Sequence, residues 1–154
     1  LLRKEIKHAL RQTGKANEAS DGMDISLCVL NRKKLIVNYA GAYNPLILIR
    51  DNKIVKYKAD KMPIGIYIRE KDVFTNHVIE ICKGDSLYMY SDGFQDQFGG
   101  EKSKKFLPKN LNNLLLEISG YPAHKQKEIL NEKLDNWKGD NPQVDDIIIL
   151  GFKI

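Results

Sequence analysis

Short apolar segments joined by very short polar links set the strongest limit on the fold of this chain. Residues 25–30 and 35–39 are mostly apolar and are joined by the polar link Asn-Arg-Lys-Lys. Residues 46–50 and 54–58 are joined by Asp-Asn-Lys. Because a parallel crossover needs a dozen or more residues, links this short join only antiparallel neighbours. The first third of the chain therefore predicts antiparallel hairpins and excludes a parallel, doubly wound sheet for this part.

Further strands are expected after the hairpins. Residues 73–81 and 86–90 flank a Lys-Gly-Asp turn, and an exposed, lysine-rich loop is expected at residues 98–105. The closing strand, residues 146–154, contains the consecutive apolar residues Ile-Ile-Ile-Leu. Because a strand that is apolar on both faces is typical of a sheet covered on both sides, we expect this strand to be central.

Apolar residues at helical spacing predict three helices. The first is expected over residues 2–11. The second ends at Gly120, and the third begins at Pro122 and ends at Gly139, since proline suits the first helical turn and glycine suits a helix end. Hairpins followed by helices indicate an α+β fold with mostly antiparallel sheet. The length fits a single domain over residues 1–154.

Charge and composition exclude some classes of protein. The net charge is +5, but the surplus of Lys and Arg lies in residues 1–58 and is spread over a helix and hairpins, which argues against a nucleic-acid footprint. No run of about 18 apolar residues exists, so we expect no membrane span. Cys28 and Cys82 lie in alternating apolar segments without a CxxC partner. We expect buried free thiols and a cytoplasmic location, with a disulfide as the less favoured alternative.

Two acidic sites stand out at strand ends. Asp92, followed by Gly93, comes directly after a predicted strand, and Asp145-Asp146 comes directly before the closing strand. These acids share one edge of a sheet if the two strands are antiparallel neighbours. Carboxylate oxygens are the ligands that Mg²⁺ and Mn²⁺ prefer. Spacing alone leaves a second interpretation open, in which Asp-Gly is an ordinary turn.

Motifs along the whole chain are similar to those of one family. In order, the sequence contains DGMDISLCVL, AGAYNP, MPIGI, SDGFQDQFGG, WKGD and QVDDIIILGFKI. Any one of them is a weak signal. The ordered set resembles the C-terminal two-thirds of a SpoIIE-like serine phosphatase domain, the bacterial branch of the metal-dependent type 2C protein phosphatases. The resemblance covers essentially all of residues 1–154.

The resemblance implies a fold, a chemistry and a set of site residues. The implied fold is an αββα sandwich of two mostly antiparallel sheets flanked by helices, with its N-terminal part missing from this chain. The implied cofactors are two divalent cations, Mn²⁺ or Mg²⁺, which activate a water for attack on phosphoserine or phosphothreonine of a partner protein. By motif position, Asp92 and Asp145 correspond to metal ligands that act through this water. Gly93, Asp146 and Asn44 are expected to support them.

Two departures from the family pattern limit the expected activity. The acid that bridges both ions in the family, shortly before a Thr-Gly-His-Gly-type segment, has no counterpart in this sequence. Ala42-Tyr43 also stand where many relatives have a histidine before the Asn-Pro pair. We therefore expect an incomplete metal site, and little phosphatase activity from these 154 residues without the longer enzyme to which they belong.

The resemblance also implies partners. Relatives often act on anti-sigma-factor antagonists in bacterial signalling and sit behind sensor or membrane segments. Sheet edges and apolar faces left open in a truncated fold lead us to expect self-association. Two alternatives stay open: a non-catalytic protein-binding or regulatory module of the same fold, and a nucleic-acid binder, which charge alone supports. The presence of both Asp92 and Asp145 favours the catalytic interpretation.

Overall fold

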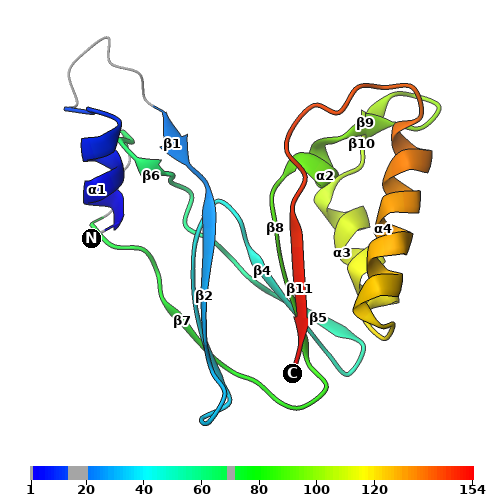
Figure 1. Ribbon diagram of the computed structural model, residues 1–154, viewed down its shortest axis with the longest axis horizontal. Coiled ribbons are helices and arrows are strands. Elements are labelled where there is room, and N and C mark those ends of the chain that lie inside the picture. Colours follow the sequence, from blue (N-terminus) through cyan, green and yellow to red (C-terminus); the bar gives the residue numbers. More distant parts are fainter. Residues whose placement is uncertain (1, 14–20, 69–71) are drawn as a thin grey trace. The chain divides into compact units, whose positions relative to one another are not determined.

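The structure is a computed structural model, and it divides the chain into two compact units (Figure 1). The described residues are 2–13, 21–68 and 72–154. The first unit consists of Leu1–Leu46 and Tyr57–Ile81, and the second of Ile47–Lys56 and Cys82–Ile154. None of the helices found in the described ranges is long and apolar enough to cross a membrane. The single domain expected from the sequence stays a prediction.

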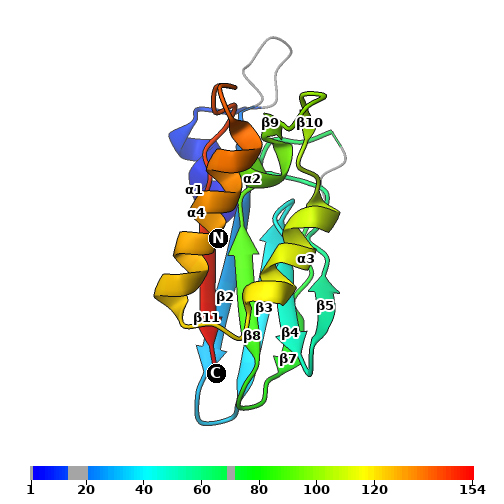
Figure 2. The same ribbon diagram turned by 90° about the vertical axis from the view of Figure 1, so that its right-hand side faces the viewer.

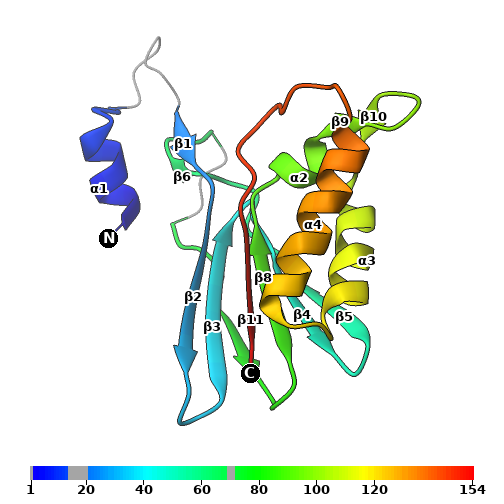
Figure 3. The same ribbon diagram turned by 45° about the vertical axis from the view of Figure 1, so that its right-hand side comes forward.

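The first unit is built on a three-stranded antiparallel sheet with the strand order β2-β3-β7. Its elements are α1 (Leu2–Ala9), β1 (Gly22–Met23), β2 (Ile25–Asn31), β3 (Ile36–Ala42), β6 (Ile64–Gly65) and β7 (His77–Glu80). Strands β2 and β3 form the predicted hairpin, whose long arms can be followed in Figure 3. The two-residue strands β1 and β6 pair with each other and were not predicted, because so short a segment carries no periodicity.

Alternation along β3 places its apolar residues in the interior of the first unit. Val37 and Tyr39 are fully buried, and the residues that alternate with them, Ile36, Asn38 and Ala40, are half-buried. On β2, by contrast, Leu27 and Val29 are more than half exposed. Strand β2 is an edge strand among the described residues, so the expectation of apolar surface at a sheet edge is confirmed. Self-association through it stays a prediction.

The second unit contains a four-stranded sheet with the strand order β11-β8-β4-β5. Its elements are β4 (Leu46–Arg50) and β5 (Lys53–Tyr57), each of which has one terminal residue in the first unit, and β8 (Ser86–Tyr90), α2 (Gly93–Asp96), β9 (Phe98–Gly99), β10 (Lys104–Lys105), α3 (Pro108–Ile118), α4 (Ala123–Lys138) and β11 (Ile149–Lys153). Helices α3 and α4 lie on one face of this sheet (Figure 2).

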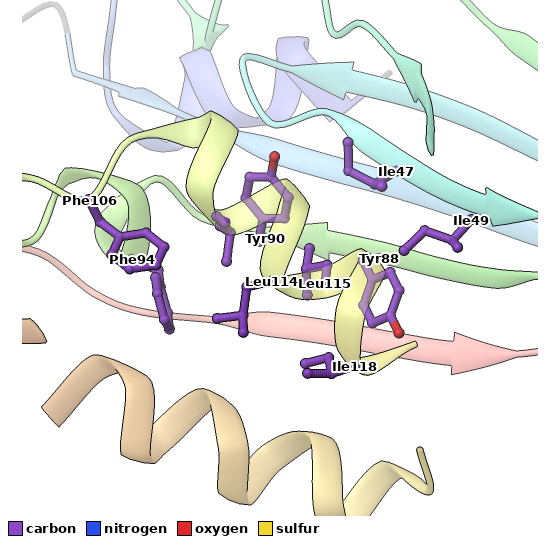
Figure 4. Packing of buried hydrophobic residues seen from close by; sticks show 10 residues of the cluster. Ile47, Ile49, Tyr88, Tyr90, Phe94, Phe106, Leu114, Leu115 and Ile118 are labelled. Carbon is purple, nitrogen blue, oxygen red and sulfur yellow. The ribbon is translucent and has the colours of Figure 1, made fainter. Parts of the chain in front are cut away.

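The core of the second unit lies between these helices and the sheet (Figure 4). The apolar stripe of α3 is buried against β4 and β8; its members are Leu111, Leu114, Leu115 and Ile118. Each fully buried leucine contributes about 1.5–3 kcal/mol through the apolar area removed from water. Phe106 packs edge-on against Phe94 and Trp137, with ring centroids 5.1 and 5.3 Å apart. The aromatic contacts join the segment after β8 to the end of α4.

Helix ends and turns agree with the sequence-based expectations where local chemistry decides them. Helix α4 begins after Pro122 and ends at Gly139, whose φ of 53° lies in the left-handed region that favours glycine. The N–H of Gly139 donates to the carbonyl of Asp135 at 2.9 Å, which satisfies a helix-end acceptor. The expected mixed α+β fold with antiparallel pairing is confirmed.

The closing strand corrects one expectation. We expected it to be central, but among the described residues β11 pairs only with β8 and forms the edge of its sheet. Ile148 is 65% exposed and Leu150 is 54% exposed, whereas Ile147 and Ile149 are half-buried against the core. The prediction was wrong because an apolar run shows which faces avoid water, while long-range pairing sets the order of the strands.

Four further expectations need correction. Residues 98–105, expected as an exposed loop, contain the paired strands β9 and β10, and Gly99 is buried. Cys82 is exposed and was not expected to be, because the alternation of β7 stops before the turn that Cys82 begins. Cys28 is half-buried, and both thiols are free. The helix predicted over residues 2–11 ends at Ala9. The strand predicted over residues 73–81 is shorter and forms β7 at His77–Glu80.

Candidate functional site

The pairing of β8 with β11 brings together the two acidic segments that the sequence analysis singled out. The strands are antiparallel, and Tyr90 at the end of β8 is opposite Ile149 at the start of β11. The residues after Tyr90 and the residues before Ile149 therefore lie at the same edge of the sheet. The link into β11 runs past α2 to this edge (Figure 3). The condition on which the strand-edge argument depended, antiparallel neighbours, is met.

Ser91 extends this pairing beyond the last residue of β8. Its N–H donates to the carbonyl of Ile148 at 3.0 Å. Its hydroxyl accepts from the N–H of Ile148 at 2.9 Å and donates to the carbonyl of Asp146 at 2.7 Å. A hydroxyl is able to do both because it has a rotatable donor and two acceptor lone pairs. Ser91, the residue before Asp92, is thus bonded to Asp146, the residue after Asp145.

Gly93 is the point of closest backbone approach between the two segments. It is buried, and a Cβ at this position would overlap the carbonyl oxygen of Asp146 and lie 2.9 Å from the carbonyl carbon. Glycine is needed here because it has no Cβ, whereas its backbone angles are ordinary. The structure places Gly93 and Asp146 next to each other, and their supporting roles at the site stay a prediction.

Asp92 presents its carboxylate at the start of α2. The residue is exposed and has helical angles of φ −75° and ψ −14°. Its carbonyl accepts the N–H of Asp96 at 2.9 Å, but within the described part of the chain its side chain makes no capping hydrogen bond to α2. Aspartate at this position usually caps the helix. The carboxylate of Asp92 is therefore not used to hold the helix that it precedes.

Asp145 and Asp146 are both exposed in the loop before β11. One carboxylate oxygen of Asp145, Oδ1, accepts the N–H of Asp146 at 2.7 Å. The carbonyl of Asp145 accepts from the side chain of Gln143 at 2.8 Å. These local bonds fix the turn that carries Asp145. That the carboxylates of Asp92 and Asp145 lie within reach of one metal ion stays a prediction.

Gln97 holds this loop from the other side and was missed by sequence reasoning. Its side chain is fully buried and donates to the carbonyl of Pro142 at 2.9 Å and to that of Phe98 at 3.1 Å. The N–H of Val144 lies 3.4 Å from its side-chain oxygen. The only sequence signal is a glutamine inside SDGFQDQFGG, directly before a Phe-Gly-Gly turn. Hydrogen bonds over more than 40 positions leave no periodic pattern.

Two glycines after Gln97 fit closely against α4. The N–H of Gly100 donates to the carbonyl of Trp137 at 2.9 Å, and Gly100 has a φ of 67°. A Cβ on Gly99 would overlap the same carbonyl group. The indole N–H of Trp137 in turn donates to the carbonyl of Gln97 at 3.0 Å. The segment that follows α2 is therefore docked on the C-terminal end of α4.

Asn44, the remaining predicted site residue, belongs to the first unit. Its carbonyl accepts from the hydroxyl of Ser26 at 2.7 Å and from that of Tyr39 at 2.6 Å. Burial raises the pKa of Tyr39 to about 12, so this hydroxyl stays a donor at neutral pH. Asn44 thus braces its own loop through the backbone. Any contribution of Asn44 to the site of Asp92 and Asp145, which lie in the second unit, stays a prediction.

The donor set suits part of a divalent-metal site. Among the residues that the structure describes, no three or more His, Cys, Asp or Glu side chains come together as a metal-binding group. Mg²⁺ is usually held by one or two carboxylates together with waters and substrate phosphate oxygens. Asp92 and Asp145 would match such a set for one ion in charge and donor type. They are the residues of this edge that could hold it.

Comparisons with known proteins identify the family and the fold. The chain matches the family model of Stage II sporulation protein E (SpoIIE) over residues 2–154. It is similar to the solved SiaA PP2C domain of Pseudomonas aeruginosa, with 28% identity and a TM-score of 0.82, and the match covers 99% of this chain and 58% of that domain. The chain therefore spans little more than half of that relative. No curated protein sequence matches it.

Two structures from Bacillus subtilis share the fold at lower identity. One contains the PP2C phosphatase domain and a regulatory fragment of SpoIIE, with 19% identity and a TM-score of 0.68 over 98% of this chain and 42% of that one. The other is the SpoIIE phosphatase domain presoaked with Mn, with 13% identity and a TM-score of 0.61 over 99% of this chain and 73% of that one. The described fold is that of PP2C phosphatase domains.

Proposed function

Since this chain belongs to the SpoIIE family, we propose that it is part of a metal-dependent protein phosphatase that hydrolyses phosphoserine or phosphothreonine on a partner protein. One observation carries the proposal: the pairing of β8 with β11 places Ser91-Asp92-Gly93 against Asp145-Asp146 at one sheet edge. A purely structural turn does not need two exposed carboxylates at the same edge. A metal site does, because hard cations take carboxylate oxygens.

In this proposal the chain's own residues hold and orient the ligands. Asp92 and Asp145 are the carboxylates that would hold Mn²⁺ or Mg²⁺, two ions in all with ligands from the rest of the enzyme. When bound, such ions supply a water of lowered pKa and neutralise the charge on the phosphoryl oxygens. Ser91 fixes the spacing of the two segments through its bonds to Ile148 and Asp146. Gly93 allows the backbones to approach.

The partners follow from the family resemblance. We propose a phosphoprotein substrate of the anti-sigma-factor-antagonist type, within bacterial signalling, and a cytoplasmic location for this part of the enzyme. Sensor or membrane segments are proposed upstream in the longer protein. Exposed apolar residues of β2, Leu27 and Val29, support self-association of the isolated chain.

A non-catalytic binding module of the same fold is the second candidate. One observation favours it: among the described residues, no three or more His, Cys, Asp or Glu side chains form a group that could hold a metal ion. An inactive module would retain the fold and its partner contacts while binding divalent metal weakly. The two candidates therefore differ in the affinity expected for Mn²⁺ and in the Mn²⁺-dependent turnover expected, both of which are lower for the binding module.

The deciding experiment is a Mn²⁺-dependent assay with p-nitrophenyl phosphate. We expect turnover by the full-length protein and little by the 154-residue chain, because two carboxylates hold the ions incompletely. Asp92→Asn in the full-length protein tests the proposed ligand. Its matched control is Asp96→Asn, since Asp96 lies on α2 but forms an exposed ion pair with Lys105 at 2.7 Å. Full-length protein without Mn²⁺-stimulated turnover would favour the binding module. Robust turnover by the short chain would contradict the incomplete site.

A further inference from the structure

We propose that Gln97 is a positioning residue that holds the Asp145 loop against the strand end that carries Asp92. The placement of the loop follows from hydrogen bonds of the described residues alone. The effect on metal binding rests on the proposed function. Among the described residues, the side chain of Gln97 bonds to backbone groups and not to either carboxylate, so it acts through the backbone of the loop.

The side-chain amide of Gln97 forms hydrogen bonds with two backbone groups of the loop. Its Nε2 donates to the carbonyl of Pro142 at 2.9 Å, and its Oε1 accepts from the N–H of Val144 at 3.4 Å. Val144 is the residue directly before Asp145. A fully buried amide has no water to replace these partners, so the loop position with both bonds made is strongly favoured.

The backbone of Gln97 is anchored on the side of Asp92. Only the four residues of α2 separate Asp92 from Gln97, which is the C-terminal cap of that helix. The carbonyl of Gln97 accepts from the N–H of Phe106 at 3.0 Å and from the indole of Trp137 at 3.0 Å. Gln97 is therefore fixed relative to α2, and its side chain transmits that position to the loop.

Ser91 and Gln97 together hold the loop at two points. Ser91 binds the carbonyl of Asp146, on the β11 side of Asp145. Gln97 binds Pro142 and Val144, on the α4 side. Asp145 lies between these two anchors. Supporting hydrogen bonds of this kind orient metal ligands, and their loss typically lowers metal affinity about 10–100-fold.

A glutamine is required because the site needs one donor and one acceptor. Methionine has a similar length but neither group, so Gln97→Met removes both bonds to the loop, together with the bond to Phe98, with little change in volume. Glutamate keeps the acceptor for Val144 but loses the donor to Pro142. We expect Gln97→Met to have the larger effect and Gln97→Glu to change the loop in the same direction.

The test uses the full-length protein with two readouts. Hydrogen exchange reports the protection of the amides at residues 143–146, and calorimetric titration with Mn²⁺ reports metal affinity. For Gln97→Met we expect faster exchange at Val144 and Mn²⁺ affinity lower by about 10–100-fold. The matched control is Gln126→Met, which removes a half-buried amide that accepts from Tyr88 at 2.9 Å and donates to Tyr121 at 2.8 Å. We expect it to leave both readouts unchanged.

Each outcome decides the proposal. Unchanged exchange at Val144 in Gln97→Met overturns it, and so does an equal loss of Mn²⁺ affinity in Gln126→Met. If Gln97→Met does not fold, the wild-type protein still decides: we expect slow exchange at Val144 although this residue is half exposed, and unprotected exchange overturns the proposal. If Asp92→Asn leaves Mn²⁺ binding unchanged, the proposed function has failed, whereas the exchange data still decide the role of Gln97.

Discussion

Two aspartates at opposite ends of β8 have opposite environments. Asp85 precedes the strand, is 1% exposed and forms a double hydrogen bond with Arg50 at 2.8 and 2.6 Å. It also accepts the N–H of Cys82 at 2.8 Å. Asp92 follows the strand, is exposed and does not cap the helix that it precedes. One carboxylate is fully engaged in holding the fold, while the other is left at the surface, where a ligand can reach it.

The glycines beside these aspartates differ in the same way. Gly84, before Asp85, has a φ of 99°, and among the described residues only its own chain neighbours come within 4 Å of where a Cβ would be. Gly93, after Asp92, has no unusual φ but touches the backbone of Asp146. The first glycine serves the turn itself, and the second allows a distant segment to approach. Burial and long-range contact, rather than the local motif, distinguish the two Gly-Asp pairs.

The largest expected effect concerns Asp92. In the full-length enzyme, Asp92→Asn should lower Mn²⁺-dependent turnover by at least about 100-fold, the upper end of the loss expected for a residue that merely supports a metal ligand. The melting temperature should stay unchanged, because the Asp92 side chain makes no capping bond within the described residues. Steady-state assays and thermal unfolding of the same preparation measure both. An active variant, or an unfolded one, would remove Asp92 from the site.

The reverse pattern is expected for Asp85. Asp85→Asn removes the buried carboxylate that pairs with Arg50 and should lower the free energy of unfolding by about 2 kcal/mol. This is less than for a fully buried pair because the Arg50 side chain is 35% exposed. Metal affinity of the folded variant should not change. Urea unfolding measures the loss, with Asp96→Asn as the control, for which an exposed pair predicts at most about 1 kcal/mol. Equal losses in the two variants would contradict the comparison.

The two glycines give a smaller effect and a sharper contrast. Gly84→Ala should cost about 1 kcal/mol of stability from its positive φ alone, with unchanged Mn²⁺ affinity. Gly93→Ala forces the Asp146 backbone away, which we expect to cost about 1–3 kcal/mol and also to weaken Mn²⁺ binding. Thermal unfolding without metal and titration with Mn²⁺ separate the two effects. Identical metal affinities would show that the approach of the two segments is not needed for the site.

The smallest effect is the pH dependence of stability. The hydrogen bond from Arg50 holds the pKa of Asp85 below its ordinary value of 3.8, although burial acts in the opposite direction. Because the folded state favours the ionised form, the contribution of Asp85 to stability is complete above the unfolded pKa and is lost as the pH falls through the lower folded pKa. The difference in melting temperature between wild type and Asp85→Asn should therefore shrink below pH 3.8. A constant difference from pH 7 to pH 2 would contradict this.

Local chemistry explains which parts of the fold were predictable. The hairpin of β2 and β3 follows from a short polar link, and the end of α4 follows from a glycine at its C-terminal cap. Each depends on residues close together in the sequence. The edge position of β11 depends on which strands pair, and the apolar run at Ile147–Leu150 carries no information on that. The exposed Cys82 was missed because the apolar alternation in the sequence continues past Glu80, where β7 ends, into a turn.

The same limit applies to the site. The edge shared by Asp92 and Asp145 was predictable because each acid lies within four residues of a strand end and a family motif marks each. Nothing in Lys-Gly-Asp reveals that Asp85 is buried, because its partner Arg50 is 35 positions away. Gln97 was invisible for the same reason, since its partners in the Asp145 loop are 45 and 47 positions away. Polar contacts between residues far apart in the sequence leave no periodic pattern from which they could be predicted.

The central claim is that Asp92 and Asp145 belong to one metal site at the edge of β8 and β11. Titration of Mn²⁺ into the full-length protein and its Asp145→Asn variant tests it most directly, with unfolding temperatures in the absence of metal as the check on the fold. The account predicts that the variant loses binding by at least about 100-fold while its metal-free melting temperature stays the same. Equal Mn²⁺ affinity in the two proteins would contradict it.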